Sequence, residues 1–183
     1  TAQLNGLDST SVAALTTTQV SSLGTTQVAG LNTTTLNRLE TTDVVALTTT
    51  EVSALTTAQL NGLNTTNLDA LTTTQVTSFS TTQVAGLTTV QLNALETTDV
   101  VALTTTEVNA LTTAQLNGLT STTLSTLTTT QVTSLGTAQV AGLTTTTLNR
   151  LSTTNVAVLT TTEGSALSTT QLNGLNTTRS EEH

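Results

Sequence analysis

The chain has 183 residues, of which 8% are charged and 35% are hydrophobic, and its formal net charge is -8. It has no lysine and a single aromatic residue, so it offers neither the basic surface nor the stacking rings of a nucleic-acid-binding protein. It has no cysteine for a disulfide or a thiolate metal site, and no apolar run approaches the ~20 residues that span a bilayer. We therefore expect no nucleic-acid partner, no cofactor and no membrane insertion.

Leucine recurs at every eighth position from Leu7 to Leu175, and Phe79 replaces it once. With leucine as position one of an octad, position three is threonine or serine, and position five is mostly Gln, Glu, Asp or Asn. Position six is Val or Leu in nearly every octad, and position eight is usually small. A fixed internal period indicates a repeat protein. We expect residues 1–178 to form one array and residues 179–183, which depart from the pattern, to be a tail added during cloning.

The octad fits neither a strand nor one continuous helix. In a strand, side chains alternate with period two, so leucine would share a face with polar positions three and five. In a continuous helix, eight residues overshoot two turns by about 80°, so the apolar stripe would wind quickly around the axis. Each octad is therefore expected to begin a new, short helix.

The start of each helix is marked by a capping box, in which a Ser or Thr at the N-cap is followed three residues later by Glu or Gln. Positions two and five have this spacing in several octads, including Thr16 and Gln19, Thr48 and Glu51, Thr56 and Gln59, and Thr104 and Glu107. A box that starts at position three is the alternative. In either case, positions three to eight give about one and a half helical turns.

Helices of this length are unstable alone, because even 12 to 15 residues are marginal in water. The predicted fold is therefore an all-α solenoid, a superhelix of very short helices with one helix per octad, stabilised by stacking. Positions one and six are expected to form its core, which includes Leu15, Val20, Leu23, Val28, Leu31, Leu36, Leu47, Val52, Leu55, Leu60, Phe79, Leu103 and Val108.

A longer period of 56 residues, or seven octads, lies above the octad, since "LETTDVVALTTTEV" begins at residue 39 and again at residue 95. Glycine at position eight recurs alternately four and three octads apart, at Gly30, Gly62, Gly86, Gly118, Gly142 and Gly174. This spacing is expected of one side of a superhelix with about 3.5 octads per turn. Small residues there would let neighbouring turns approach closely.

Carboxylates are the chain's main reactive side chains. The acidic cluster contains Glu40, Asp43 and Glu51, and its copy contains Glu96, Asp99 and Glu107. Paired carboxylates bind hard cations such as calcium, but acidic residues also favour helix N-termini, where the helix dipole stabilises negative charge. We favour the second interpretation and expect no enzyme, because a nucleophile has no histidine, lysine or cysteine within the repeats to activate it. A threonine face that binds ice is a further alternative.

The segments "LTTTEVSAL" (Leu47–Leu55) and "LTTAQLNGL" (Leu55–Leu63) resemble octapeptide arrays of very large, repetitive bacterial surface and secreted proteins, including adhesin-like proteins. The resemblance covers nearly the whole chain. It implies a structural spacer or stalk outside the cytoplasm, whose partners are other parts of a longer parent chain, and it carries no active site.

The octad at 159–166 is predicted to be a weak point, because Gly164 stands at position six where earlier octads have Val or Leu. If position six is buried there, Gly164→Val should stabilise the array by about 2 kcal/mol. Amide exchange should be faster beyond Leu159 than within residues 60–140.

Overall fold

The computed structural model describes residues 1–175, and these residues contain 22 helices and no strand. Each helix has four to six residues, and one helix occurs per octad. The predicted all-α solenoid of very short helices is therefore confirmed. The tail expected at 179–183 lies outside the described residues.

In most octads the side chain at position two caps the start of the helix. Helix α7 (Thr49–Ala54) has Thr48 as its N-cap; the Thr48 hydroxyl accepts from the Glu51 N–H at 3.3 Å, and a Glu51 carboxylate oxygen accepts from the Thr48 N–H at 2.6 Å. The helix ends at Leu55, whose backbone is extended (φ -61°, ψ 136°). The box therefore starts at position two, and the alternative start at position three is wrong.

The chain divides into two compact units, and residues 1–102 form the first. Its helices are α1 (Ala2–Asn5), α2 (Ser9–Ala13), α3 (Thr17–Ser21), α4 (Thr25–Ala29), α5 (Thr33–Leu36), α6 (Thr41–Ala46), α7 (Thr49–Ala54), α8 (Thr57–Gly62), α9 (Thr65–Asp69), α10 (Thr73–Val76), α11 (Thr81–Gly86), α12 (Thr89–Ala94) and α13 (Thr97–Ala102).

The second unit begins at Leu103. Its helices are α14 (Thr105–Ala110), α15 (Thr113–Gly118), α16 (Ser121–Thr126), α17 (Thr129–Val132), α18 (Thr137–Ala141), α19 (Thr145–Arg150), α20 (Thr153–Ala157), α21 (Thr161–Ala166) and α22 (Thr169–Asn173).

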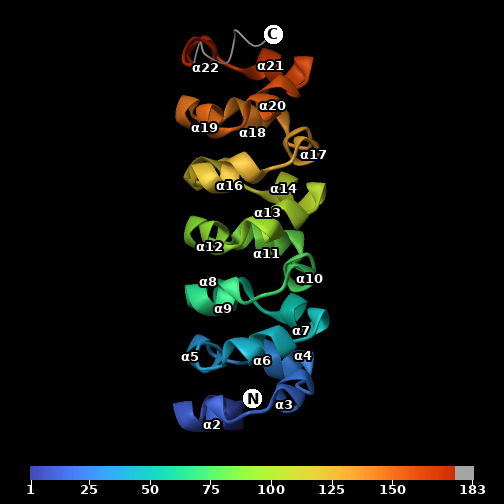
Figure 1. Cartoon of the computed structure of the whole chain (residues 1–183), viewed down its shortest axis with the longest axis vertical. Coiled ribbons are helices and arrows are strands. Elements are labelled where there is room, and N and C mark those ends of the chain that lie inside the picture. Colours follow the sequence, from blue (N-terminus) through green and yellow to red (C-terminus); the bar gives the residue numbers. More distant parts are fainter. Residues whose placement is uncertain (176–183) are drawn as a thin grey trace. The chain divides into compact units, whose positions relative to one another are not determined.

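Within each unit, successive turns of the solenoid stack on one another. In the first unit α4 packs against α7, and Figure 1 shows α5 near α8 and α6 near α9. In the second unit, α16 packs against α19, and α18 against α21. The bonds between turns centre on residues 28 apart, which is three and a half octads. The predicted superhelical repeat of about 3.5 octads per turn is therefore what each unit adopts.

The core lies between the turns and consists of leucine at position one and Val or Leu at position six. Val52 and Val108 are fully buried, and Phe79 fills a leucine position with 4% of its surface exposed. Leu15 and Leu23, which the sequence places in the core, are only half-buried. They belong to the first turn of the described chain, which has no earlier turn beneath it to cover position one.

Candidate functional site

The most distinctive chemistry of the array lies at position five, where a side-chain amide bridges two turns. Gln75 is buried, and its amide nitrogen donates to the carbonyl oxygens of Val44 at 2.9 Å, Val45 at 3.3 Å and Leu47 at 2.7 Å, all in the preceding turn. Its amide oxygen accepts from the Thr72 N–H at 2.8 Å and completes the capping box. We call this arrangement a turn-bridging amide.

The same bridge recurs in both units. Its donors in the first unit are Gln59, Asn67, Gln75 and Gln83. Its donors in the second unit are Gln131, Gln139, Asn155 and Gln171. Each donates to the position-one carbonyl 28 residues earlier. Carbonyl groups exposed by the interruption between helices thus find donors, which is the usual requirement for buried backbone.

Of the caps expected from the sequence, Thr16–Gln19, Thr48–Glu51, Thr56–Gln59 and Thr104–Glu107 all form reciprocal capping boxes in the structure. The sequence did not indicate that the position-five side chain would also be buried. Gln59 and Glu107, for example, are 5% and 4% exposed.

Asparagine at position seven makes a second bridge, which sequence reasoning missed. The Asn61 amide nitrogen donates to the Gly86 carbonyl at 2.8 Å, and its amide oxygen accepts from the Thr88 N–H at 2.9 Å. The side chain thereby pairs with backbone in the next turn as another backbone amide would. We call this the asparagine clasp. Asn5, Asn37 and Asn117 make the same two bonds to their next turns.

The glycine in each clasp allows the turns to approach closely. A Cβ atom on Gly86 would lie 2.4 Å from the Thr57 methyl carbon of the preceding turn, and one on Gly62 would lie 2.3 Å from that of Thr33. Side-chain carbons do not approach each other so closely. The signal in the sequence is an asparagine at position seven followed 25 residues later by a glycine at position eight.

Five position-five residues are acidic rather than amide-bearing, and all five are buried. These are Asp43, Glu51, Asp99, Glu107 and Glu163. A carboxylate accepts hydrogen bonds but has no proton to donate to carbonyl groups of the preceding turn. Among the described residues, buried oxygens without a hydrogen-bond partner include Oε1 of Glu51 and Oδ2 of Asp99.

Burial also changes the acid–base chemistry of these groups. It raises the pKa of the Asp99 carboxyl above its ordinary value; the Thr73 hydroxyl bond lowers that pKa, and the nearby Glu96 and Asp69 carboxylates raise it. Burial likewise raises the pKa of Asp43; a hydrogen bond from the Glu40 backbone lowers that pKa, and the charge of the Glu40 carboxylate raises it.

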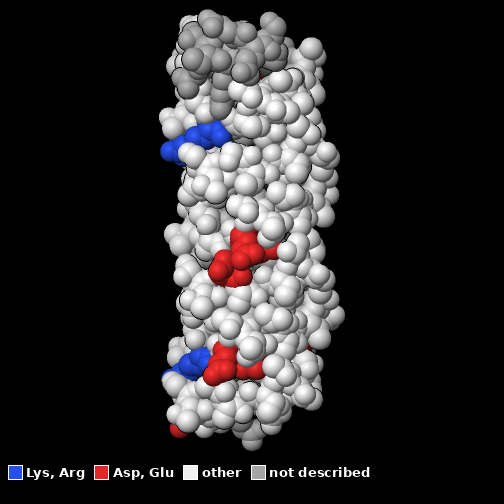
Figure 2. Space-filling view, in the orientation of Figure 1, with Lys and Arg blue, Asp and Glu red and all other residues white. Residues whose placement is uncertain are grey.

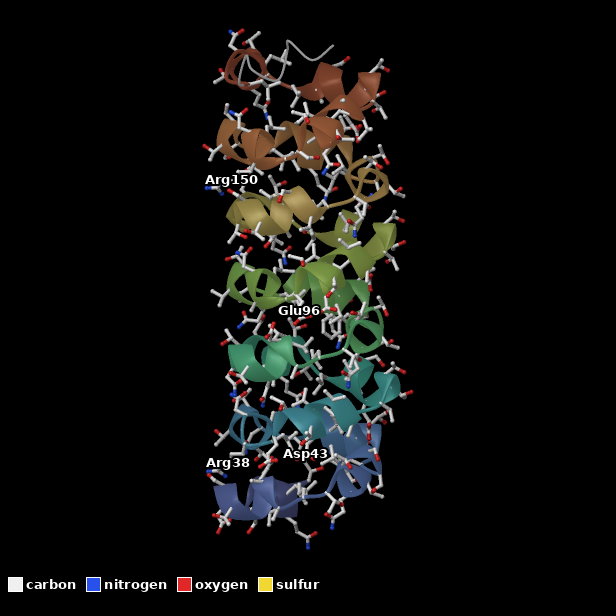
Figure 3. The ribbon with its side chains drawn as sticks, viewed as in Figure 1. Arg38, Asp43, Glu96 and Arg150 are labelled. Atoms are coloured by element: carbon white, nitrogen blue, oxygen red, sulfur yellow. The ribbon has the colours of Figure 1, made fainter. Side chains whose placement is uncertain are left out.

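The acidic side chains of Glu40, Asp43, Glu51, Glu96, Asp99 and Glu107 were the candidates for a metal site. On the face shown in Figure 2, acidic side chains gather in two places, one around Asp43 and one around Glu96, both labelled in Figure 3. Within residues 1–175, no three acidic or histidine side chains converge as metal ligands would.

The described residues also contain one open groove and two bridging arginines. The groove has a volume of about 540 Å³ and is lined by Thr65, Thr66, Asp69, Val90, Asn93 and Ala94.

Arg38 donates to the Leu7 carbonyl at 2.8 Å, and Arg150 donates to the Leu119 carbonyl at 3.3 Å. The arginines thus act as further bridges between turns.

Comparison with known families identifies the repeat. A family model described as the ALTTAQ repeat matches residues 36–73, 92–129 and 108–145, which together make up just over half of the chain. The chain therefore belongs to the ALTTAQ repeat family. The hexapeptide itself occurs at 54–59 and 110–115, where it runs from position eight through the leucine and the cap to the glutamine of position five, which is a turn-bridging amide at Gln59. No curated protein and no solved structure matches the chain. Across the described residues, no helix has the length and apolar character needed to cross a membrane.

Proposed function

We propose that this chain is a non-catalytic structural segment, a spacer or stalk within a longer protein that lies outside the cytoplasm. The supporting observation is the bridge between turns, which recurs at a constant offset of 28 residues in each unit. A turn joined to its neighbours by a repeated set of bonds lets an array gain length by gaining octads. The location outside the cytoplasm and the longer parent chain follow from the sequence resemblance alone.

The proposal assigns the buried polar groups to a structural task. The position-five amides and the asparagine clasps form their hydrogen bonds with the backbone of neighbouring turns, as Gln83 does with Val52 and Leu55. Repeat proteins of this kind derive their stability from interfaces between neighbouring repeats. A spacer function needs this property and no convergent catalytic group.

Small-angle scattering on chains with one, two and three copies of the 56-residue block tests the proposal. A spacer should gain a constant increment in maximum dimension with each block. A radius of gyration of about 16 Å for the 183-residue chain, the value of a compact domain of this length, contradicts it.

A binding function is the second candidate, because threonine at positions three and four is exposed in many octads, as at Thr49, Thr50 and Thr105. Ice is one ligand for such a surface, and calcium is another through the acidic residues. Thermal hysteresis in solution supports ice binding. A melting temperature that rises by several degrees in millimolar calcium supports calcium binding, since a ligand of the folded state stabilises it by mass action.

A further inference from the structure

Asp99 occupies a position where other octads carry a hydrogen-bond donor. Asn67, which is one carbon shorter than the glutamines, donates from its amide to the carbonyls of Leu36 at 3.0 Å and Leu39 at 3.3 Å, 31 and 28 residues earlier. The same register places the carbonyls of Leu68 and Leu71 opposite Asp99. Asparagine and aspartic acid have the same shape. Where asparagine carries its amide NH₂, aspartic acid carries a second carboxyl oxygen.

One of the two Asp99 oxygens is accounted for and the other is not. Oδ1 accepts a hydrogen bond of 2.7 Å from the Thr73 hydroxyl. Oδ2 is buried and has no partner among the described residues, and the residue as a whole is 1% exposed. A buried acceptor without a donor is costly, and an ionised one that faces carbonyl oxygens is costlier.

We propose that Asp99 binds a proton on Oδ2 in the folded array and donates it to the carbonyl oxygens of Leu68 and Leu71, so that the protonated carboxyl acts as a turn-bridging donor. The proton adds to the carboxylate and leaves Asp99 neutral, and no other bond changes. The structural result is a bridge between turns that tightens in acid. This inference does not depend on the spacer function.

The charged groups around Asp99 all favour the protonated form. Helix α10, which packs against α13, contains no ionisable residue and contributes the Thr73 hydroxyl. Helix α9 contributes Asp69, and the residue preceding α13 is Glu96; both carboxylates raise the Asp99 pKa. Helix α12 contains no ionisable residue. No cation from these elements compensates an ionised Asp99.

The direction of the pH dependence follows from this. A folded-state pKa above the unfolded value means that the folded chain holds more protons, so this contribution to stability is complete below the unfolded pKa. It is lost as the pH rises through the folded pKa. Each unit by which the folded pKa exceeds the unfolded one changes the folding equilibrium constant by about tenfold.

Asp43 provides a matched control within the same unit. It lies 56 residues earlier in an identical local sequence, but Ala13 replaces Asp69 at the corresponding place. Burial raises its pKa as well. Neither of its oxygens is both buried and without a partner, unlike Oδ2 of Asp99. Asp43 therefore tests whether burial alone explains the effect.

The experiment combines ¹³C NMR titration of the aspartate carboxyls with urea unfolding of the wild type, Asp99→Asn and Asp43→Asn between pH 4 and pH 8. We expect Asp99 to titrate above Asp8, whose pKa is lowered by its bonds to Ser11. We expect the wild-type folding equilibrium constant to fall by about tenfold or more over this range. Asp99→Asn should remove most of that fall and stabilise the chain at pH 8, because its amide donates at every pH.

Two results would overturn the proposal. The first is an Asp99→Asn variant whose stability changes with pH in parallel with the wild type. The second is an Asp43→Asn variant that removes as much of the pH dependence as Asp99→Asn, since burial without an unpartnered oxygen would then be sufficient. Circular dichroism of each variant at pH 5 verifies that the helical array is retained.

Discussion

Two octads of almost identical sequence, residues 15–22 and 71–78, have different environments. They differ only at position seven, where Ser21 corresponds to Thr77. Both form the same capping box, from Thr16 to Gln19 and from Thr72 to Gln75. In the first octad Gln19 is exposed and Leu15 is half-buried, whereas Gln75 and Leu71 in the second are buried.

The difference shows which properties belong to an octad and which belong to the stack. The cap needs only residues three apart and therefore forms wherever the octad occurs. Burial of the leucine and the bridge from the glutamine need a preceding turn, which residues 71–78 have and residues 15–22 lack among the described residues. Local structure is thus determined within the eight residues of one octad. Stability depends on contacts between residues 28 positions apart, which is the offset of the bridge.

The largest expected effect comes from removing a turn-bridging amide. We expect Gln75→Ala to destabilise the first unit by about 2–3 kcal/mol, because the carbonyl of Leu47 loses its donor and the cap is weakened as well. Gln19→Ala removes the cap contribution alone and should cost less than about 1 kcal/mol. Urea unfolding followed by circular dichroism measures both. Equal losses would show that the bridge adds nothing to stability.

A somewhat smaller effect is expected from filling the space beside a clasp. Gly86→Ala places a Cβ 2.4 Å from the Thr57 methyl carbon and should cost about 1–3 kcal/mol through overpacking. Adding Thr57→Ser removes that methyl and should restore part of the loss. Gly164→Ala is the matched control, since its Cβ would meet nothing within 4 Å. If both alanine variants unfold at the same urea concentration, the close approach does not require glycine.

Removing the N-cap hydroxyl should cost the same stability in the two octads. Thr16→Ala and Thr72→Ala each remove an N-cap hydroxyl from an exposed residue, so each should cost about 1 kcal/mol. We expect the two losses to agree within about 0.5 kcal/mol, the usual limit of additivity for independent sites. Amide exchange at Gln19 and Gln75 measures them locally. A much larger loss for Thr72→Ala would mean that cap and bridge are coupled.

The sequence predicted the features that are set within one eight-residue octad. It predicted only part of the features that depend on residues 28 positions apart. Leucine at position one, the caps and the one-helix-per-octad arrangement follow from local patterns, and the glycine spacing indicated 3.5 octads per turn. The role of Gln75 as a bridge and of Asn61 as a clasp was missed, because their partners lie 25 to 31 residues away. An octad pattern also places polar side chains on the surface by default, so the burial of Asp99 was not foreseen.

The smallest expected effect concerns Gly164, where the structure changes a prediction from sequence. If position six of this octad were fully buried, Gly164→Val would stabilise the array by about 2 kcal/mol. In the structure a Cβ at 164 meets nothing within 4 Å, and Leu172, at position six of the next octad, is 48% exposed. Valine would therefore gain little burial there.

What remains for Gly164→Val is its backbone effect. Gly164 lies inside α21, and replacing a helical glycine by a residue with a side chain removes conformational freedom from the unfolded chain. We expect a stabilisation of about 0.5 kcal/mol, measured by urea unfolding. Amide exchange should still be faster beyond Leu159 than in residues 60–140, because Leu159 and Leu167 are half-buried whereas Leu71 and Leu111 are buried. A stabilisation near 2 kcal/mol would instead mean that the valine packs into a covered core and that this octad resembles residues 71–78 rather than residues 15–22.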